Sequence, residues 1–281
     1  MKKILFTCLL RNNELYIPYM HDMLEDIKNK NNNYNIDYLF YTDNNTDNTV
    51  DLLNKYNYNY IEDDFQEKDI DRIKKLSILR QKLLVETIKN NPDYIIMFDT
   101  DVFFNGSMIK KALKKINAEN IQFSALNTIV YPYPIFYDYA AYSCKFYDVS
   151  ILFFKSLFSD SIKVKKFFNG VFIIKNKEGL LKNINYITNE PFSCEHDIFN
   201  KKLEKHNYDI TVLNDITPLY SEKKHFFESK KVDNGTKYFS SYKLVSSNKT
   251  DLRYRKITIF IIFVLLILFS YLIFKIILKY L

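Results

Sequence analysis

The chain has 281 residues, of which 47% are hydrophobic and 26% charged, enough for one large domain or two small ones. Its 40 lysines and arginines outnumber its 33 acidic residues, giving a net charge of +7, but the lysines are scattered and do not form a nucleic-acid-binding stripe. The three cysteines have no metal or redox spacing, so they indicate reduced cytosolic thiols rather than a disulfide framework.

The first hundred residues alternate between short apolar runs and amphipathic stretches. The run at residues 4–10 is too short for a signal peptide and is followed by no cleavage site, so we predict a buried strand. The pattern predicts strands at residues 3–10, 36–42, 58–63 and 93–98 and helices at residues 15–28, 50–57 and 71–90. This alternation is typical of an α/β fold with a Rossmann-like, open, mostly parallel sheet flanked by helices. Ligands of such sheets gather at the carboxyl ends of the strands.

Beyond Gly106 the pattern is less regular. Residues 122–142 are aromatic and punctuated by prolines, which indicates a loop-rich wall. A strand, a helix and a further strand are predicted at residues 166–176, 193–207 and 209–215. We expect Ser193 to cap this helix and Asn207 to end it.

The C-terminal part contains an uncharged run at residues 257–274, interrupted only by Thr258, Ser270 and Tyr271. A helix of this length spans about 27 Å, close to the thickness of a membrane core. The basic residues just before it favour a cytosolic location for the N-terminal part under the positive-inside rule. We therefore expect a folded domain of residues 1–220, a polar and basic linker of residues 221–256, and a single-pass transmembrane helix at residues 257–274.

Two carboxylates, Asp99 and Asp101, directly follow the apolar strand predicted at residues 93–98. Residues two apart on a strand point to the same side, and two ionised carboxylates held together repel. No lysine or arginine lies between Asn91 and Lys110 to compensate them. A divalent cation is the natural compensation, and hard oxygen ligands favour Mg²⁺ or Mn²⁺.

Three other interpretations of this pair remain open. The acids can be solvent-facing turn residues or helix caps. They can be the motif of a haloacid-dehalogenase-like phosphatase, although that motif usually lies near the N-terminus and is followed by threonine rather than by Val102 and Phe103. They can also belong to a catalytically inert, membrane-anchored module of the same fold.

Residues 71–104 resemble the nucleotide-sugar-binding core of GT-A glycosyltransferases. They are most similar to the capsule-associated α-1,3-mannosyltransferase family and more loosely to the Golgi mannan-polymerase subunits. Arg72, Leu76 and Arg80 match the family's helix before the acidic motif, but Gln81 replaces its asparagine. The segments around Asp43, Asp138, Asn169 and Glu195 resemble four further motifs in the same order, with Asp43 in place of a glutamate.

The resemblance implies a role for each matching residue. Asp99 and Asp101 would hold Mn²⁺ or Mg²⁺ on the donor diphosphate, and His225 would be a further metal ligand. The other donor-site residues would be Arg11 and Asp43 at the base and ribose, Arg80 at the phosphate or sugar, Asp138 at a sugar, and Asn169 and Gly170 where the backbone approaches a sugar. Glu195 or its neighbour Asp197 would activate or orient the acceptor hydroxyl.

From the residues alone, each of these positions also admits a purely structural role. The structural readings are a surface arginine for Arg80, turn or loop polar residues for Arg11, Asp43 and Asp138, a strand-entry turn for Asn169 and Gly170, a helix-start acid for Glu195, and a surface histidine for His225. The resemblance implies a metal-dependent glycosyltransferase that moves a sugar from a nucleotide-diphosphate sugar to a hydroxyl of a glycan, protein or lipid. It favours GDP-mannose as donor and retention of configuration. No nucleic-acid partner is expected.

Overall fold

The computed structural model describes residues 1–65, 70–130, 135–136, 151–152, 155–156, 158–177, 179–188 and 194–220, together with residues 261, 264 and 269. The helices are α1 (Ile17–Lys30), α2 (Thr49–Lys55), α3 (Arg72–Lys89), α4 (Gly106–Ala118) and α6 (Glu195–Lys205), with a 3-10 helix at Leu180–Lys182. The strands of the larger sheet are β1 (Lys2–Leu10), β2 (Tyr34–Asp43), β3 (Tyr60–Asp63), β4 (Tyr94–Phe98), β6 (Phe123–Leu126), β9 (Ser161–Val164), β10 (Val171–Lys175) and β11 (Ile210–Leu213). The smaller sheet contains β5 (Val102–Phe103), β7 (Ile129–Val130), β8 (Ile135–Phe136) and β12 (Leu219–Tyr220).

The larger sheet has the strand order β3-β2-β1-β4-β10-β6-β11-β9. Strands β1 to β4 are parallel to one another, β10 runs antiparallel to both of its neighbours, and β11 is again parallel to β6. The carboxyl ends of β1 to β4, β6 and β11 therefore lie at one edge, together with the amino end of β10. The smaller sheet packs its strands in the order β5-β12-β7-β8.

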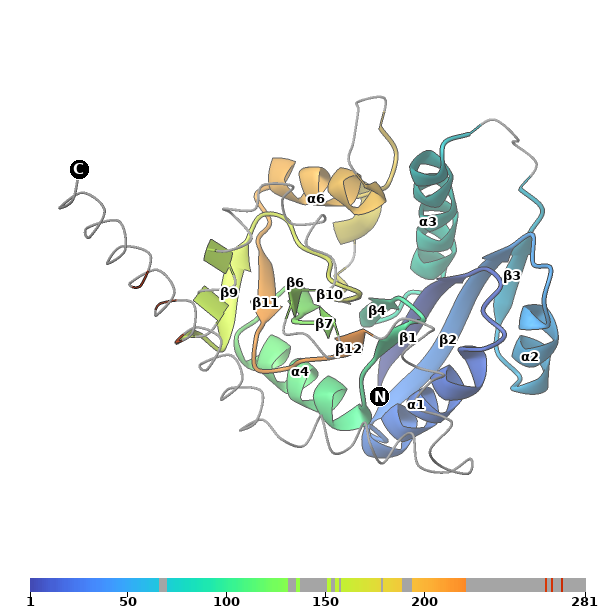
Figure 1. Ribbon diagram of the computed structural model, residues 1–281, viewed down its shortest axis with the longest axis horizontal. Coiled ribbons are helices and arrows are strands. Elements are labelled where there is room, and N and C mark those ends of the chain that lie inside the picture. The colour runs from blue at the N-terminus through green and yellow to red at the C-terminus, as the bar shows by residue number, and fades with distance from the viewer. Residues whose placement is uncertain are drawn as a thin grey trace.

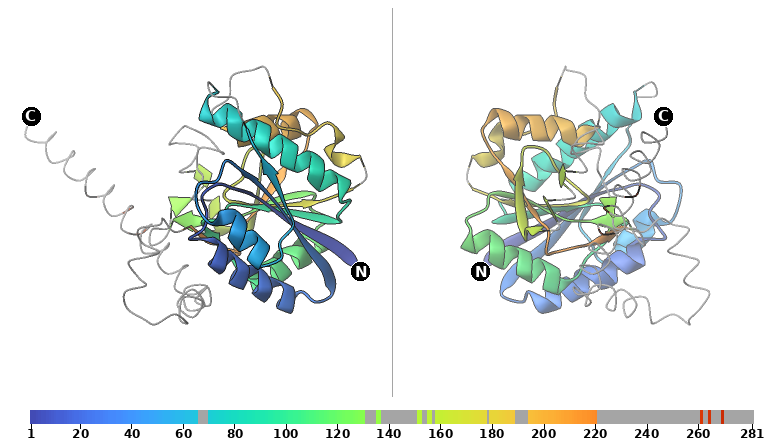
Figure 2. Two further views of the ribbon diagram at one scale, coloured as in Figure 1. Left: turned by 90° about the vertical axis from the view of Figure 1, so that its right-hand side faces the viewer. Right: turned by 60° about the vertical axis from the view of Figure 1, so that its left-hand side comes forward.

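Helices cover both faces of the larger sheet. Helices α3 and α6 lie on one face, and α1, α2 and α4 lie on the other (Figures 1 and 2). Strand β4 separates the two layers of core. Its residues Tyr94, Ile96 and Phe98 pack in the cluster that contains α1 and α4, whereas Ile95 and Met97 pack in the cluster that contains α6. All five residues of β4 are buried, which confirms the prediction of a strand buried on both faces.

Helix α4 begins at a close approach to α1. A Cβ on Gly106 would lie 2.6 Å from the carbonyl oxygen of Asp26, so only glycine fits at this contact. The Gly106 N–H donates to Asp26 Oδ2 (2.9 Å), and its carbonyl accepts from Asn31 Nδ2 (3.0 Å). These bonds fix the start of α4 against the C-terminal half of α1.

The structure corrects two of the sequence-based expectations. Residues 122–142 were expected to form an irregular wall, but they contain β6, a buried strand paired with β10 and β11 on either side. Its four residues are too few to show a period, and both of its partners are distant in sequence. Helix α6 is capped by Cys194, with no side-chain hydrogen bond, rather than by Ser193. Asn207 follows the helix with a φ of 58°, as expected for a helix stop.

Within the described residues, no helix is long and apolar enough to cross a membrane. The transmembrane helix predicted at residues 257–274 lies outside the described part of the chain except at residues 261, 264 and 269. It therefore stays a prediction from the sequence, as does the linker at residues 221–256.

Candidate active site

Asp99 and Asp101 lie in a tight turn between β4 and β5, at the carboxyl edge of the sheet. The Asp99 N–H donates to the Gly170 carbonyl (3.0 Å), and the Val102 N–H donates to the Asp99 carbonyl (3.1 Å). Thr100, between the two acids, accepts a hydrogen bond at Oγ1 from Asn13 Nδ2 (3.0 Å). The turn is therefore held from both sides, while the Asp99 side chain keeps 22% of its surface exposed.

Arg80 joins the acidic turn to the start of α6. From the middle of α3, its Nη2 donates to Asp99 Oδ1 (3.2 Å) and its Nε donates to Glu195 Oε1 (3.1 Å). The guanidinium lies over the Phe168 ring, 5.4 Å from the centroid, and the Arg80 side chain is only 8% exposed. Burial opposes the positive charge, but Glu195 and Asp99 outweigh it and raise the pKa of Arg80, so the side chain remains a cation.

Glu195 is the first residue of α6 and is buried against His196. Its Oε1 lies 3.5 Å from His196 Nε2, and the imidazole stacks on Phe168 with the ring centroids 3.5 Å apart. Burial, followed by the charge of Arg80, lowers the pKa of His196 to about 3, so the ring is neutral at physiological pH. Burial alone would raise the pKa of Glu195, but His196 and Arg80 outweigh it and lower that pKa to about 2. Glu195 is therefore an ionised carboxylate beside a neutral histidine.

Asp197, the alternative acid, occupies a different environment from Glu195. Its Oδ1 lies 3.3 Å from Lys166 Nζ, and its Oδ2 lies 3.2 Å from Lys201 Nζ, one turn further along α6. The two acids therefore belong to separate ion-pair clusters. Of the two, Glu195 is the one connected to the acidic turn.

Helix α3 also binds Tyr186, beside the cluster formed by Arg80, Asp99 and Glu195. Ser77 Oγ donates to the Tyr186 carbonyl (2.6 Å), and Gln81 Oε1 accepts from the Tyr186 N–H (2.8 Å). The Tyr186 ring stacks on Phe199 of α6, with the centroids 5.0 Å apart. Burial raises the pKa of Tyr186, and its hydroxyl has no hydrogen-bond partner among the described residues. Gln81, at the position where the resembling families have asparagine, thus fastens a loop to the active-site helix.

Asn169 and Gly170 form the turn that enters β10, with φ angles of 58° and 78°. The buried Asn169 amide donates from Nδ2 to the carbonyls of Leu126 (3.2 Å) and Thr128 (2.9 Å). These bonds join β10 to the end of β6. The turn thereby presents the Gly170 carbonyl to Asp99.

Asp43 and Arg11 follow β2 and β1 at the same edge. Asp43 is buried and forms an ion pair with Lys75 of α3, whose ammonium lies over the Phe65 ring at 5.1 Å. Arg11 is exposed, and its backbone N–H donates to Asn13 Oδ1 (2.7 Å). Asp43 is therefore already paired in this structure, whereas the Arg11 side chain reaches solvent.

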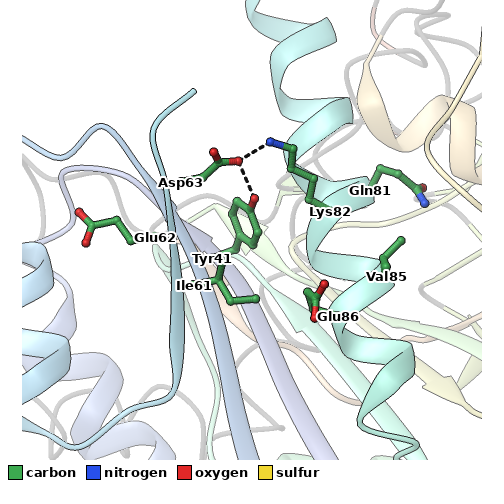
Figure 3. A pocket seen from close by; sticks show the side chains of 8 residues that line it. All are labelled: Tyr41, Ile61, Glu62, Asp63, Gln81, Lys82, Val85 and Glu86. Atoms are coloured by element: carbon green, nitrogen blue, oxygen red, sulfur yellow. Dashed lines mark hydrogen bonds and ion pairs between the residues drawn. The ribbon is translucent and has the colours of Figure 1, made fainter. Parts of the chain in front are cut away.

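A groove of about 600 Å³ lies between α3 and the β2–β3 edge of the sheet. Figure 3 shows its lining, with Tyr41, Lys82 and Asp63 at one end. Asp63 Oδ2 accepts from Tyr41 Oη (2.6 Å) and from Lys82 Nζ (2.5 Å). Lys82 and Arg80 are both on α3 but bind different acids, and Arg80, Asp99 and Glu195 are not among the residues that line the groove.

Sequence reasoning missed the polar network that orders the loops after β1 and β2. Asn12 bonds two residues of the loop after β2: its N–H donates to Asn45 Oδ1 (2.9 Å), and its Oδ1 accepts from the Thr46 N–H (2.8 Å). Glu14 accepts from the side chain of Asn48 (2.9 Å), and the Asn13 N–H donates to Thr49 Oγ1 (2.7 Å). The signal was present as two Asn-rich strand ends, since such residues bond readily to nearby backbone.

Eleven binding and catalytic residues were predicted from the sequence. Eight of them lie at or next to the carboxyl edge of the sheet: Arg11, Asp43, Arg80, Asp99, Asp101, Asn169, Gly170 and Glu195. Asp197 lies in the separate cluster with Lys166 and Lys201. Asp138 and His225 lie outside the described residues. The described part of the chain contains no group of three or more His, Cys, Asp or Glu side chains placed to hold a metal ion. Asp99 and Asp101 nevertheless supply carboxylate oxygens, the ligand type that Mn²⁺ and Mg²⁺ prefer, and these ions commonly take their remaining ligands from phosphate and water.

No protein-family model matches the chain, and no curated protein matches it. Among solved structures it is similar to S. aureus TarS, with a TM-score of 0.53 and 17% identity over 79% of this chain and 37% of that one. TarS 1–349 in complex with UDP-GlcNAc matches with a TM-score of 0.51 and 17% identity over 79% of this chain and 59% of that one. The mannosyltransferase PcManGT from Pyrobaculum calidifontis, in complex with GDP-Man and Mn²⁺, matches with a TM-score of 0.52 and 11% identity. The match covers 83% of this chain and 65% of that one.

The chain thus spans less than two thirds of each of these three structures. At such identities the likeness concerns the fold, and the fold is of the GT-A type expected from the sequence. The narrower resemblance to capsule-associated mannosyltransferases is not reproduced among these matches.

Proposed function

We propose that this protein is a metal-dependent glycosyltransferase that moves a sugar from a nucleotide-diphosphate sugar to a hydroxyl group of a glycan, protein or lipid. The observation that carries the proposal is the convergence of Asp99, Arg80 and Glu195 at the carboxyl edge of a GT-A sheet. Two structures that share the fold contain UDP-GlcNAc, or GDP-Man with Mn²⁺. The motif resemblance favours GDP-mannose as the donor.

Asp99 and Asp101 are the residues that would hold Mn²⁺ or Mg²⁺. A cation bound there would act as a Lewis acid that stabilises the departing nucleoside diphosphate. The turn is suited to this role because its backbone is fixed by Gly170 and its Thr100 side chain by Asn13. The other donor contacts in the proposal are Arg11 and Asp43 for base and ribose and the Asn169–Gly170 turn for the sugar. Asp138 as a sugar contact and His225 as a further metal ligand lie outside the described residues.

Glu195 is the carboxylate that would face the acceptor. Its Oε1 already accepts a hydrogen bond from Arg80 Nε (3.1 Å), and its pKa is lowered, so it is a weak proton acceptor, whereas an efficient general base has a pKa near the working pH. We therefore assign it an orienting role: it accepts a hydrogen bond from the acceptor hydroxyl and stabilises positive charge at an oxocarbenium-like centre. Asp197, paired with two lysines, is the alternative.

The test incubates the purified chain with MnCl₂ and each of a panel of UDP- and GDP-sugars. Donor turnover is measured as the release of UDP or GDP. Asp101→Asn should lower turnover at least about a hundredfold, as expected when a charge-stabilising group is lost. Asp51→Asn, an exposed acid on α2, is the matched control and should retain activity. Release of phosphate from p-nitrophenyl phosphate with no turnover of any nucleotide sugar would instead establish a phosphatase.

We also propose that residues 257–274 anchor the protein in a membrane with residues 1–220 on the cytosolic side. The support is the uncharged apolar run and the basic residues before it. The full chain should resist extraction from membranes by alkaline carbonate, whereas a chain ending at residue 256 should be released. Release of both chains would contradict the anchor without bearing on the enzymatic proposal.

A further inference from the structure

The buried guanidinium of Arg80 binds two carboxylates to which the proposed function gives different roles. Arg80 binds Asp99 through Nη2 and Glu195 through Nε, at 3.2 and 3.1 Å. The three side chains have exposed fractions of 8%, 22% and 11%, so Asp99 is the more accessible of the two acids. One positive charge is thus divided between an acid that would hold the metal and an acid that would face the acceptor.

The geometry points to Arg80 as a positioning residue that couples cation binding at Asp99 to the orientation of Glu195, an inference that rests on the proposed function. In the ligand-free protein the guanidinium is shared. A divalent cation on Asp99 replaces Arg80 as the charge partner of that acid, and Arg80 is then left to Glu195 alone. The acceptor-facing carboxylate is held most firmly when the donor side of the site is loaded.

The electrostatics give the coupling its sign. A positive charge beside Asp99 opposes the arrival of a second cation, because like charges a few ångströms apart in a partly buried site repel strongly. Glu195 draws the charge of Arg80 away from Asp99 and so weakens this opposition. By thermodynamic linkage, a cation bound at Asp99 strengthens the pairing of Arg80 with Glu195 by the same factor.

The surroundings favour a switch between partners over release of the guanidinium to solvent. Phe168 lies against the guanidinium, and its ring is also stacked with His196 (3.5 Å between centroids) and with Phe172 (5.6 Å). Ser77 and Gln81, on the same helix as Arg80, are committed to Tyr186. The helix and the aromatic layer therefore hold Arg80 between its two acids.

A double-mutant cycle on Mn²⁺ binding tests the coupling without any catalytic readout. The free ion is measured by its EPR signal during titration of the full chain with MnCl₂, alone and with UDP or GDP. We expect Glu195→Gln to weaken Mn²⁺ binding about tenfold, and Arg80→Met to tighten it. In the Arg80→Met background, Glu195→Gln should have no further effect, because Glu195 acts through Arg80. Lys74→Met, which also removes a positive charge at an exposed position of α3, is the control and should leave affinity unchanged.

Arg80→Lys keeps the positive charge and is the second background for the cycle if Arg80→Met does not fold. A lysine cannot form the two-armed contact of a guanidinium, so the effect of Glu195→Gln should shrink in this background too. If Glu195→Gln changed the Mn²⁺ affinity equally in all backgrounds, the inference would be overturned, since the charge of Glu195 would then act on the ion directly and not through Arg80. Unchanged affinity in every Arg80 and Glu195 variant, with binding lost in Asp101→Asn, would also overturn it but leave the proposed function intact. Absence of Mn²⁺ binding to the unmodified chain under all conditions would overturn both.

Discussion

The side chain of Asn13 donates a hydrogen bond of 3.0 Å to the hydroxyl of Thr100, the residue between Asp99 and Asp101. This bond joins the loop after β1 to the turn after β4, and the Asn13 backbone is in turn held by Thr49 at the start of α2 (2.7 Å). Three strand ends are thereby tied into one rigid edge. Rigidity matters here because a cation site requires its carboxylates to be held in place before the ion arrives.

Asn13→Ala should loosen the acidic turn without unfolding the protein. We expect the free energy of unfolding to fall by about 1 kcal/mol, the usual contribution of one partly buried hydrogen bond. Mn²⁺ affinity should fall several-fold, since the turn loses one of its supports. Urea unfolding and Mn²⁺ titration measure the two effects. Asn33→Ala, at an exposed site between α1 and β2, is the control, and an unchanged Mn²⁺ affinity in Asn13→Ala would show that the bond does not support the site.

Gln81→Ala should detach Tyr186 from α3 on one side. The Tyr186 N–H would lose its 2.8 Å bond, and a loss of about 1–2 kcal/mol in the free energy of unfolding is expected for an unpaired, partly buried donor. Gln81→Asn, which introduces the residue of the resembling families, is one methylene shorter and should not restore the bond. Thermal unfolding of both variants checks this. Wild-type stability in Gln81→Asn would indicate that the Tyr186 loop adjusts to the shorter side chain.

The elements that the sequence predicted well carry their signal locally. The unbroken apolar run of β4 and the two acids directly after it were enough to predict a buried strand ending at a binding edge, and the alternation before it predicted the parallel half of the sheet. Helix α4 also had a readable stripe in Ile109, Ala112, Leu113 and Ile116, all buried against the core.

The remaining features depend on contacts between distant residues. Strand β6 is recognisable only through its pairing with β10 and β11, because four residues carry no period. The resemblance assigned Arg80 to the donor, whereas in the structure its guanidinium binds Asp99 and Glu195, which lie 19 and 115 positions away. His196 offered no sequence signal for its neutral, stacked state, since that state depends on burial against Phe168.

His196 should make the fold sensitive to mild acid. Burial lowers its pKa to about 3, so below about pH 6.5 the unfolded chain binds a proton that the folded chain excludes. The free energy of unfolding should therefore fall as the pH falls, with His196 contributing up to about 1.4 kcal/mol per pH unit. Glu195, whose pKa is lowered from 4.5 to about 2, adds its own loss only below pH 4.5.

Urea unfolding between pH 7 and pH 5 isolates the contribution of His196. His196→Phe retains an aromatic ring on Phe168 but cannot bind a proton, so its unfolding free energy should fall less steeply with pH over this range. His206→Gln changes an exposed histidine at the end of α6 and should keep the wild-type slope. Equal slopes for the wild type and His196→Phe would mean that the folded protein protonates His196 readily.

Asn169 allows a structural role to be separated from a role in sugar binding. Its buried amide bonds the carbonyls of Leu126 and Thr128, and its φ of 58° is unfavourable for most side chains. Asn169→Gly removes the amide but tolerates the backbone conformation, whereas Asn169→Ala removes the amide and adds backbone strain. Both variants should lose about 2–3 kcal/mol of unfolding free energy through the two unpaired carbonyls, and alanine about 1 kcal/mol more than glycine. Chemical denaturation gives these values, and donor KM in the glycine variant gives the second comparison. A glycine variant of wild-type stability with a raised KM would place Asn169 in sugar binding. We expect instead that the loss of stability is the larger effect, because both hydrogen bonds of the amide are made within the protein.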